Sequence, residues 1–164
     1  GFRHHRPSAY TNGMIAFVSG DLLAAKVEAL VNPVNTVGVM GKGLALAFKK
    51  AFPANFKAYE AAAKAGVLAV GSVFVFEAVG LVQPRYILNF PTKAHWRDPS
   101  KLSYVEDGLR DLVRVVRARK IGSIAIPALG AGLGGLPWDD VRPLITRGLA
   151  ELEDVEIQVF APLG

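Results

Sequence analysis

Short apolar runs typical of β-strands alternate along this chain with segments of helical periodicity, and this alternation limits the folds open to it. The β-type runs cover residues 15–19, 28–32, 72–77, 86–90, 124–127 and 155–161. The helical segments cover residues 44–52, 55–65, 102–119 and 137–152. Strands that alternate with helices predict an α/β domain whose central sheet is covered largely on both faces.

The composition fits one domain with a sizeable core. The chain has 164 residues, of which 51% are apolar and 20% are charged, so disorder is not expected. The absence of cysteine excludes a disulfide scaffold, a thiol nucleophile and a cysteine-ligated metal. The longest apolar stretch, residues 66–82, contains Glu77 and several glycines, and is too short and too interrupted to span a membrane. With no secretory signal visible, we expect a cytoplasmic protein.

The first 13 residues, GFRHHRPSAYTNG, lack the periodicity of the rest of the chain. We interpret residues 1–13 as a flexible leader or expression remnant, and we expect ordered structure to begin at Met14. These residues hold two of the 19 basic side chains and no acid, so the other 17 basic residues exceed the 14 acidic ones by three. This excess is compatible with a polyanionic partner and equally with a solvated basic surface.

Two glycine clusters each follow a β-type run. They are TVGVMGKGLA at Thr36–Ala45 and GAGLGG at Gly130–Gly135. In α/β sheets, ligands bind beyond the carboxyl ends of the strands, so we expect both clusters at one edge of the sheet. Glycine lets backbone N–H groups approach a phosphate, which favours an anion site. A tight turn, the alternative, needs only one or two of these glycines.

Other nucleotide, metal and nucleophile motifs fit poorly. Gly130–Gly135 matches G-x-G-x-x-G, but the next strand ends in Phe160 and Ala161 instead of an acid, which disfavours a dinucleotide fold. Lys42 is followed by glycine and leucine, which is not the spacing of a P-loop. No His, Asp or Glu group has metal-ligand spacing, and no serine lies in a nucleophile elbow. We expect neither a metal nor another cofactor.

Four segments together resemble a macrodomain in order and spacing. They are Ile15-x(4)-Gly20-Asp21-Leu22, Val31-Asn32-Pro33-Val34-Asn35, the first glycine cluster and Ile126-Pro127-Ala128-Leu129-Gly130-Ala131-Gly132. The resemblance covers residues 14–164, which we take as a single macrodomain. It implies a three-layer α/β/α sandwich with a mixed central sheet, and it implies that the chain binds ADP-ribose.

The resemblance also implies ligand contacts. Asp21 would accept a hydrogen bond from the adenine amino group, with the Leu22 amide nearby, and Asn35 would hold the distal ribose. A carboxylate suits an amine and backbone donors suit a diphosphate, although Asp21 would serve equally as a helix N-cap. The other implied ligand-binding residues are Gly20, Thr36, Gly41, Lys42, Gly43, Leu44, Ala45, Pro91, Thr92, Pro127, Leu129, Gly130, Ala131, Gly132, Leu133 and Gly134.

The segment Thr36–Gly43, followed by Phe48-Lys49-Lys50-Ala51-Phe52-Pro53, resembles the DarG-type branch of macrodomains. Proteins of that branch are antitoxins that remove ADP-ribose from thymidine in DNA and oppose a DarT toxin. The branch and its vertebrate relative, which removes ADP-ribose from glutamate, carry a lysine that corresponds to Lys93. The vertebrate relative has a catalytic aspartate where this chain has Gly134, so the DNA branch fits better.

Lys93 and Asn35 are the catalytic residues that the resemblance implies. We expect Lys93 to follow a strand end, after a turn fixed by Pro91. A lysine partly desolvated there could attack the anomeric carbon of the ribose. It could instead stay charged and stabilise the leaving base. The sequence leaves both roles open.

The implied function is a hydrolase that removes ADP-ribose from thymidine in single-stranded DNA. The alternatives are a non-catalytic ADP-ribose reader and an esterase acting on modified protein carboxylates. The missing acid at Gly134 counts against the esterase. The implied partners are ADP-ribose, ADP-ribosylated single-stranded DNA and, through a region outside this chain, a DarT-type toxin, with no membrane.

His95, Trp96 and Arg97 combine aromatic rings with positive charge and are our candidates for DNA contact by base stacking. Packing of Trp96 on the domain is the alternative. Two further groups are interpreted as structural. They are the lysines Lys49, Lys50 and Lys57, taken as polar helix faces, and Trp138-Asp139-Asp140, taken as a capped helix start.

Overall fold

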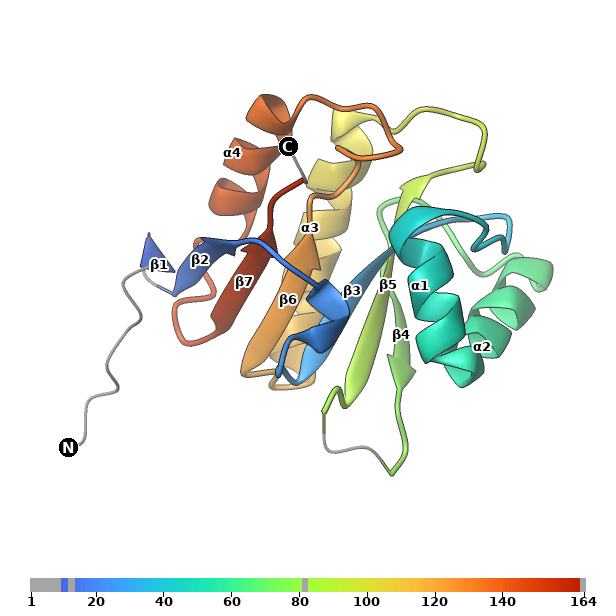
Figure 1. Cartoon of the computed structure of the whole chain (residues 1–164), viewed down its shortest axis with the longest axis horizontal. Coiled ribbons are helices and arrows are strands. Elements are labelled where there is room, and N and C mark those ends of the chain that lie inside the picture. Colours follow the sequence, from blue (N-terminus) through green and yellow to red (C-terminus); the bar gives the residue numbers. More distant parts are fainter. Residues whose placement is uncertain (1–9, 12–13, 81–82, 163–164) are drawn as a thin grey trace.

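The computed structural model describes residues 10–11, 14–80 and 83–162, which form one sheet with helices on both sides (Figure 1). The sheet has seven strands within these ranges, in the order β1-β2-β7-β6-β3-β5-β4. The strands are β1 (Tyr10–Thr11), β2 (Ile15–Val18), β3 (Ala29–Asn35), β4 (Phe74–Glu77), β5 (Tyr86–Lys93), β6 (Ser123–Pro127) and β7 (Glu156–Phe160). The helices are η1 (Leu22–Ala24), α1 (Gly43–Ala51), α2 (Pro53–Lys64), α3 (Leu102–Ala118) and α4 (Trp138–Gly148).

The central strands are parallel, and the strands at both edges are antiparallel. β2, β7, β6, β3 and β5 pair in parallel, whereas β1 pairs antiparallel with β2 and β4 with β5. The mixed sheet is the one expected. Because parallel strands point the same way, the carboxyl ends of the five central strands lie along one edge, which we call the carboxyl edge.

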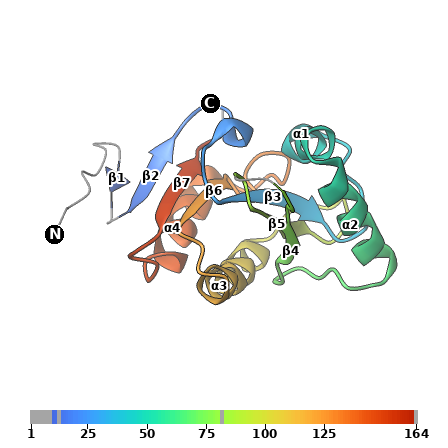
Figure 2. The same cartoon turned by 90° about the horizontal axis from the view of Figure 1, so that it is seen from below.

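The helices form the two outer layers (Figure 2). α3 and α4 cover one face of the sheet, and η1, α1 and α2 cover the other. Neighbouring strand residues face opposite layers: Val31 packs in the cluster of Leu109 from α3, whereas Leu30 packs with Phe48 from α1. Complete burial of such a side chain stabilises the fold by about 1.5–3 kcal/mol. The expected three-layer α/β/α sandwich is confirmed.

Two prolines that the sequence analysis placed at the ends of strands lie inside them. β3 continues through Pro33, and β5 continues through Pro91, so the expected turn at Pro91 is wrong. Proline cannot donate a backbone hydrogen bond, which confines it to unpaired sides of strands. β3 pairs with β6 only at Ala29 and Leu30, and β5 pairs with β4 only up to Asn89. Both prolines therefore lie where one side of their strand is unpaired.

The other differences concern ends of elements. Pairing of the sheet begins at Tyr10–Thr11, earlier than the expected Met14, while residues 1–9 and 12–13 of the predicted leader lie outside the described residues. α4 begins at Trp138 as expected, but its N-cap residue is Pro137 and no side chain caps it, so the predicted cap is wrong. Among the residues described, no helix has the length and apolar character needed to cross a membrane.

Gly108 of α3 packs closely against Phe90 of the sheet. A β-carbon at this position would collide with the ring of Phe90. Alanine in a helix interior ordinarily stabilises by about 1 kcal/mol relative to glycine. We expect Gly108→Ala instead to lower the free energy of unfolding by about 1–3 kcal/mol, because it overpacks the core. Urea unfolding measures the change, with Ser103→Ala on the exposed part of α3 as control. Equal stability of wild type and Gly108→Ala would contradict this packing.

Candidate functional site

Three loops meet at the carboxyl edge, each following a parallel strand. We call them the first glycine loop (residues 36–42, after β3), the Trp96 loop (residues 94–101, after β5) and the second glycine loop (residues 130–135, after β6). The backbone N–H and the hydroxyl of Thr36 both donate to the carbonyl of Ala94, at 3.3 and 2.6 Å. These bonds join the first glycine loop to the Trp96 loop.

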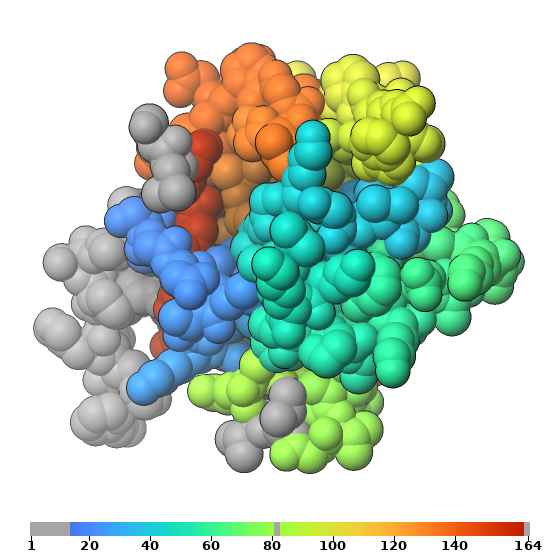
Figure 3. Space-filling view, turned by 45° about the vertical axis from the view of Figure 1, so that its right-hand side comes forward, coloured from blue at the N-terminus to red at the C-terminus, as the bar shows by residue number. Residues whose placement is uncertain are grey.

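The second glycine loop contacts the other two. The Gly134 carbonyl accepts a hydrogen bond from the Ser100 N–H at 3.0 Å. A β-carbon on Gly43, at the start of α1, would lie 3.1 Å from Cδ1 of Leu133. The segments of all three loops lie side by side in Figure 3, in cyan, yellow and orange. The prediction that both glycine clusters lie at one edge is confirmed.

Asn35 ends β3 and organises the first glycine loop. Its side chain is buried, and Nδ2 donates to the Val39 carbonyl at 2.7 Å. Its Oδ1 accepts from the N–H groups of Val37 and Val39, at 3.1 and 3.4 Å. These bonds use the oxygen and one N–H of the amide, which leaves the second N–H for a ligand.

Tyr59 of α2 holds the Asn35 side chain in place from the helix layer that contains α1 and α2. Its hydroxyl lies 2.7 Å from the Asn35 carbonyl oxygen and 2.8 Å from Asn35 Oδ1, so its single proton is shared between these two acceptors. Tyr59 is fully buried, and burial raises the pKa of its hydroxyl from 10.0 to about 12, against the opposing effect of backbone hydrogen bonds. The hydroxyl therefore keeps its proton, and its role as donor, well above neutral pH.

A buried cluster of three asparagines joins α2 to the sheet. Asn89 of β5 exchanges hydrogen bonds with Asn55 of α2 at 2.8 and 3.1 Å, and it accepts one from Asn32 of β3 at 3.1 Å. Asn55 and Tyr59 lie one turn apart on α2, so the same helix face holds both the sheet and Asn35. The sequence analysis missed this cluster. Its signal was an asparagine within each of two apolar runs that become neighbouring strands.

Lys93 is the last residue of β5, where the register with β3 shifts. Val34 pairs with Pro91, but the next residue, Asn35, pairs with Lys93 and passes over Thr92. A shift of one residue exchanges the faces to which neighbouring side chains point. The irregularity therefore brings Lys93 opposite Asn35 at the strand ends.

The ammonium group of Lys93 joins the Trp96 loop to the second glycine loop. Its Nζ donates to the Leu133 carbonyl at 3.1 Å and to the Trp96 carbonyl at 3.4 Å. An ammonium has three N–H donors, so one remains for a ligand. Lys93 and Asn35, the two predicted catalytic residues, thus each keep one donor at the junction of the loops.

Gly134 packs too closely against its surroundings to carry a side chain. A β-carbon there would collide with the Gly130 carbonyl oxygen and with Oγ of Ser100. Ser100 is buried, and its Oγ has no hydrogen-bond partner within the described part of the chain. The loop as folded has no room for an acid at position 134.

Asp21 and Leu22 lie at the same edge, after β2. Asp21 is exposed and caps η1, since its carboxylate accepts from the Leu23 N–H at 3.0 Å. Leu22 is buried in one cluster with Phe48 of α1 and Ala125 of β6, which places η1 beside the site on the α1 face. The predicted capping role of Asp21 is confirmed, and its contact with adenine stays a prediction.

The side chains of the Trp96 loop stack on one another. The ring centres of His95 and Trp96 lie 5.2 Å apart, and Cζ of Arg97 lies 4.5 Å from the centre of the Trp96 ring. Nδ1 of His95 also accepts the Arg97 N–H at 3.1 Å. Trp96 remains 42% exposed, so it keeps surface for a base, and contact with DNA stays a prediction.

The other predicted ligand residues follow the strand ends. The exposed ones are Gly20, Gly41, Lys42, Gly43 and Gly132, with Leu133 at 67% exposure. The buried ones are Pro91, Thr92, Pro127, Leu129 and Gly130. Those of intermediate exposure are Leu44 and Ala45, in the first turn of α1, and Ala131. The exposed set lies along the carboxyl edge after the strands, whereas the buried set can offer a ligand mainly backbone groups.

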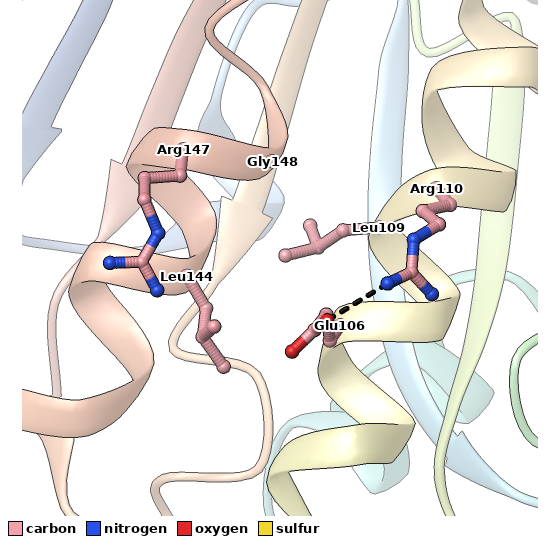
Figure 4. A pocket seen from close by; sticks show the side chains of 6 residues that line it. All are labelled: Glu106, Leu109, Arg110, Leu144, Arg147 and Gly148. Carbon is pink, nitrogen blue, oxygen red and sulfur yellow. Dashed lines mark hydrogen bonds and ion pairs between the residues drawn. The ribbon is translucent and has the colours of Figure 1, made fainter.

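A separate hollow of about 250 Å³ lies between α3 and α4 (Figure 4). It is lined by Glu106, Leu109, Arg110, Leu144, Arg147 and Gly148. Glu106 and Arg110 in its wall form an ion pair at 2.8 Å. None of the residues predicted from the sequence lines this hollow, so we place the functional site at the carboxyl edge.

The Tyr59–Asn35 contact gives stability a pH dependence. Near neutral pH, we expect Tyr59→Phe to lower the free energy of unfolding by about 1–3 kcal/mol, because Asn35 loses a buried donor. The hydroxyl has its ordinary pKa of 10.0 in the unfolded chain and a pKa of about 12 when folded. Its contribution is therefore complete below pH 10 and is lost as the pH rises towards 12, by at most about 2.7 kcal/mol. The difference in free energy of unfolding between wild type and Tyr59→Phe, measured with urea, should be smaller at pH 11 than at pH 8. An equal difference at both pH values would contradict a protonated Tyr59 hydroxyl as the donor to Asn35.

The second glycine loop offers a matched pair of substitutions. We expect Gly134→Ala to lower the free energy of unfolding by about 1–3 kcal/mol, because a backbone carbonyl and Ser100 fill the space of the new methyl group. Gly132→Ala is the control, since a β-carbon there meets nothing within 4 Å. Thermal unfolding of both variants measures the effect. If Gly134→Ala were as stable as Gly132→Ala, the second glycine loop would have to rearrange at little cost to make room for the methyl group.

Comparison with known proteins agrees with this site. The sequence matches the macro domain family over residues 31–145. It is 56% identical over 150 residues to a protein of Thermus aquaticus named DNA ADP-ribosyl glycohydrolase. That match covers 92% of this chain and 42% of the relative, so the chain spans about two fifths of the relative's length.

Solved structures show the same relationship. The macrodomain of Mycobacterium tuberculosis DarG is 52% identical, with a TM-score of 0.90, and the match covers 92% of this chain and 99% of that one. Thermosipho africanus DarTG in complex with ADP-ribose is 37% identical, with a TM-score of 0.87, and the match covers 93% of this chain and 42% of that one. The chain therefore belongs to the macro domain family, in its DarG-type branch.

Proposed function

We propose that this chain is a hydrolase that removes ADP-ribose from thymidine bases of single-stranded DNA, and that it is the antitoxin of a DarT-type DNA ADP-ribosyltransferase. The observation that carries the proposal is the position of Lys93, whose Nζ is held by the carbonyls of Leu133 and Trp96 where the loops meet. The name of the Thermus aquaticus relative supports the DNA reaction.

ADP-ribose is the group that the carboxyl edge would bind. α1 begins without a side-chain cap, so the N–H groups of its first turn are open to a diphosphate, which the positive end of the helix dipole also attracts. The second glycine loop would cover the other side of the diphosphate. Asn35 would give its remaining N–H to the distal ribose, and Asp21 would accept from adenine. The ADP-ribose complex of Thermosipho africanus DarTG supports this choice.

The reaction breaks the bond between the anomeric carbon of the ribose and a thymine nitrogen. The base leaves with the electron pair of that bond, and a charged Lys93 beside it would stabilise the developing negative charge. Water then adds to the anomeric carbon, and the proton that the water loses balances the one that the thymine nitrogen takes up. In the alternative route, Lys93 first loses a proton. Its free electron pair then forms a new bond to the anomeric carbon as the base leaves, and the thymine nitrogen takes up a proton. The ribose ring opens to a Schiff base with the lysine, and water later hydrolyses this bond to release ADP-ribose. Since Gly134 leaves no room for an acid, both routes depend on the lysine.

The DNA and the toxin complete the proposal. The exposed ring of Trp96, next to Arg97, would stack on a base neighbouring the modified thymidine. We place contact with the toxin outside this chain, in the part of the longer relatives that the match does not cover. The proposed location is the cytoplasm, where the DNA of a bacterial cell lies.

Replacing Lys93 tests the proposal directly. We expect Lys93→Ala to lower the release of ADP-ribose from a modified thymidine oligonucleotide by on the order of 100-fold or more, because a charge-stabilising donor is lost. Binding of free ADP-ribose should change little, since Asp21 and the glycine loops would make those contacts. Chromatographic quantification of the released ADP-ribose measures turnover, and calorimetry measures binding. A wild-type protein that binds ADP-ribose but releases none would be a reader, not a hydrolase.

Lys93→Arg separates the two routes. Arginine keeps the charge but is effectively never deprotonated, so it can stabilise a leaving base but cannot act as a nucleophile. Measurable turnover by Lys93→Arg would therefore support the electrostatic role. An inactive arginine variant, together with a borohydride-trapped adduct of wild-type enzyme and substrate, would support attack by the amine. ADP-ribosylated protein, offered in parallel, tests the esterase alternative.

A further inference from the structure

The positive charge of this protein is unevenly distributed. Residues 29–76, which include the first glycine loop, α1 and α2, contain five lysines and one acid, Glu60. Residues 102–151, which include α3 and α4, contain seven basic and six acidic residues. The excess charge is therefore on the side of the sheet that carries α1 and α2.

The two sides also differ in how their charges are compensated. Every ion pair within the described ranges uses an arginine, and three of the six lie within α3, such as Arg110 with Asp107 and Arg114 with Asp111. The α1 and α2 side contributes none of them. Its lysines, which we call the lysine face, are all exposed and are Lys42, Lys49, Lys50, Lys57 and Lys64.

We propose that the lysine face binds the sugar–phosphate backbone of the polynucleotide that carries the modified base; this inference rests on the proposed function and deepens it. A phosphate backbone carries one charge per nucleotide and is bound chiefly by such uncompensated cations. Lysine, a compact charge on a flexible stem, suits a contact that fixes no base sequence.

The lysine face continues directly from the functional site. Lys42 is the N-cap residue of α1, and the next residue, Gly43, approaches Leu133 of the second glycine loop. Lys49 and Lys50 follow about 10 Å farther along the helix, at 1.5 Å per residue. Nζ of Lys49 lies 4.4 Å from the centre of the Phe56 ring on α2, so its charge bridges the two helices. Figure 3 shows the surface of α1 and α2 adjoining the first glycine loop.

The three loops at the carboxyl edge also carry exposed apolar side chains. Val37 and Val39 of the first glycine loop are 44% and 41% exposed, Leu133 of the second glycine loop is 67% exposed, and Trp96 of the Trp96 loop is 42% exposed. A single strand that crosses the site would place bases against these side chains and phosphates against the lysines on one side and Arg97 on the other. The strand would then run from α1, over Lys93, to the Trp96 loop.

The test compares two double variants. Lys50→Gln/Lys57→Gln removes charge from the lysine face, and Lys26→Gln/Lys120→Gln removes the same charge from exposed positions outside it. Binding of an unmodified single-stranded oligonucleotide is measured against salt concentration. Each phosphate contact contributes about 0.7 to the log–log slope, so the first variant should lose about 1.4 and the second nothing. On modified DNA, the first variant should show a severalfold higher KM with an unchanged kcat.

The outcomes separate this inference from the proposed function. Equal salt-dependence slopes for folded wild type and folded Lys50→Gln/Lys57→Gln would overturn the proposal that the lysine face binds phosphates. The same loss in both double variants would also overturn it, since only net charge would then matter. Binding to anionic lipid vesicles without binding to the oligonucleotide would replace the partner by a membrane surface. Failure of wild type to release ADP-ribose would refute the proposed function alone, because the salt dependence needs no turnover.

Discussion

The parallel pairing of β3 with β5 is the constraint on which the candidate site depends. It runs from Ala29 with Tyr86 to Asn35 with Lys93, and between them Asn32 faces Asn89 in the buried interior. The one-residue irregularity at the end of this ladder decides which side chain of β5 stands opposite Asn35. A slip along the ladder would exchange the buried and ligand-facing side chains together, so the core fixes the position of the lysine.

The loops at the carboxyl edge are shaped before any ligand arrives. Asn35 folds back the first glycine loop, Tyr59 fixes Asn35, and Asn55 fixes the helix that carries Tyr59. A buried amide or hydroxyl that loses its partner costs free energy, so each of these bonds allows few alternative arrangements. The result is a set of backbone donors and a lysine held in place by elements of the core, which is the condition for stabilising charge as it develops.

Close packing of the second glycine loop limits the chemistry. Gly134 lies against Ser100 and the Gly130 carbonyl, so no carboxylate fits in the loop as folded, and Lys93 provides the charge at the junction. The uncompensated lysines lie at the start of α1 and along α1 and α2, directly after the first glycine loop. The loop junction thus combines a set of fixed donors with an adjoining surface of lysines. That combination suits a small modification carried on a long polyanion.

The sequence by itself determined the α/β class, the helix that the structure shows as α3, the position of both glycine clusters at one edge of the sheet, and the family. These follow from local periodicity and short motifs. It also predicted Asn35 and Lys93 as the catalytic residues. The tertiary structure alone decided that Pro33 and Pro91 lie inside strands, that Lys93 stands opposite Asn35, and that it bonds to Leu133, 40 residues away. It also decided that three asparagines meet in the core. These features depend on which strands become neighbours and in which register, and such long-range pairing leaves no periodic signal in the chain.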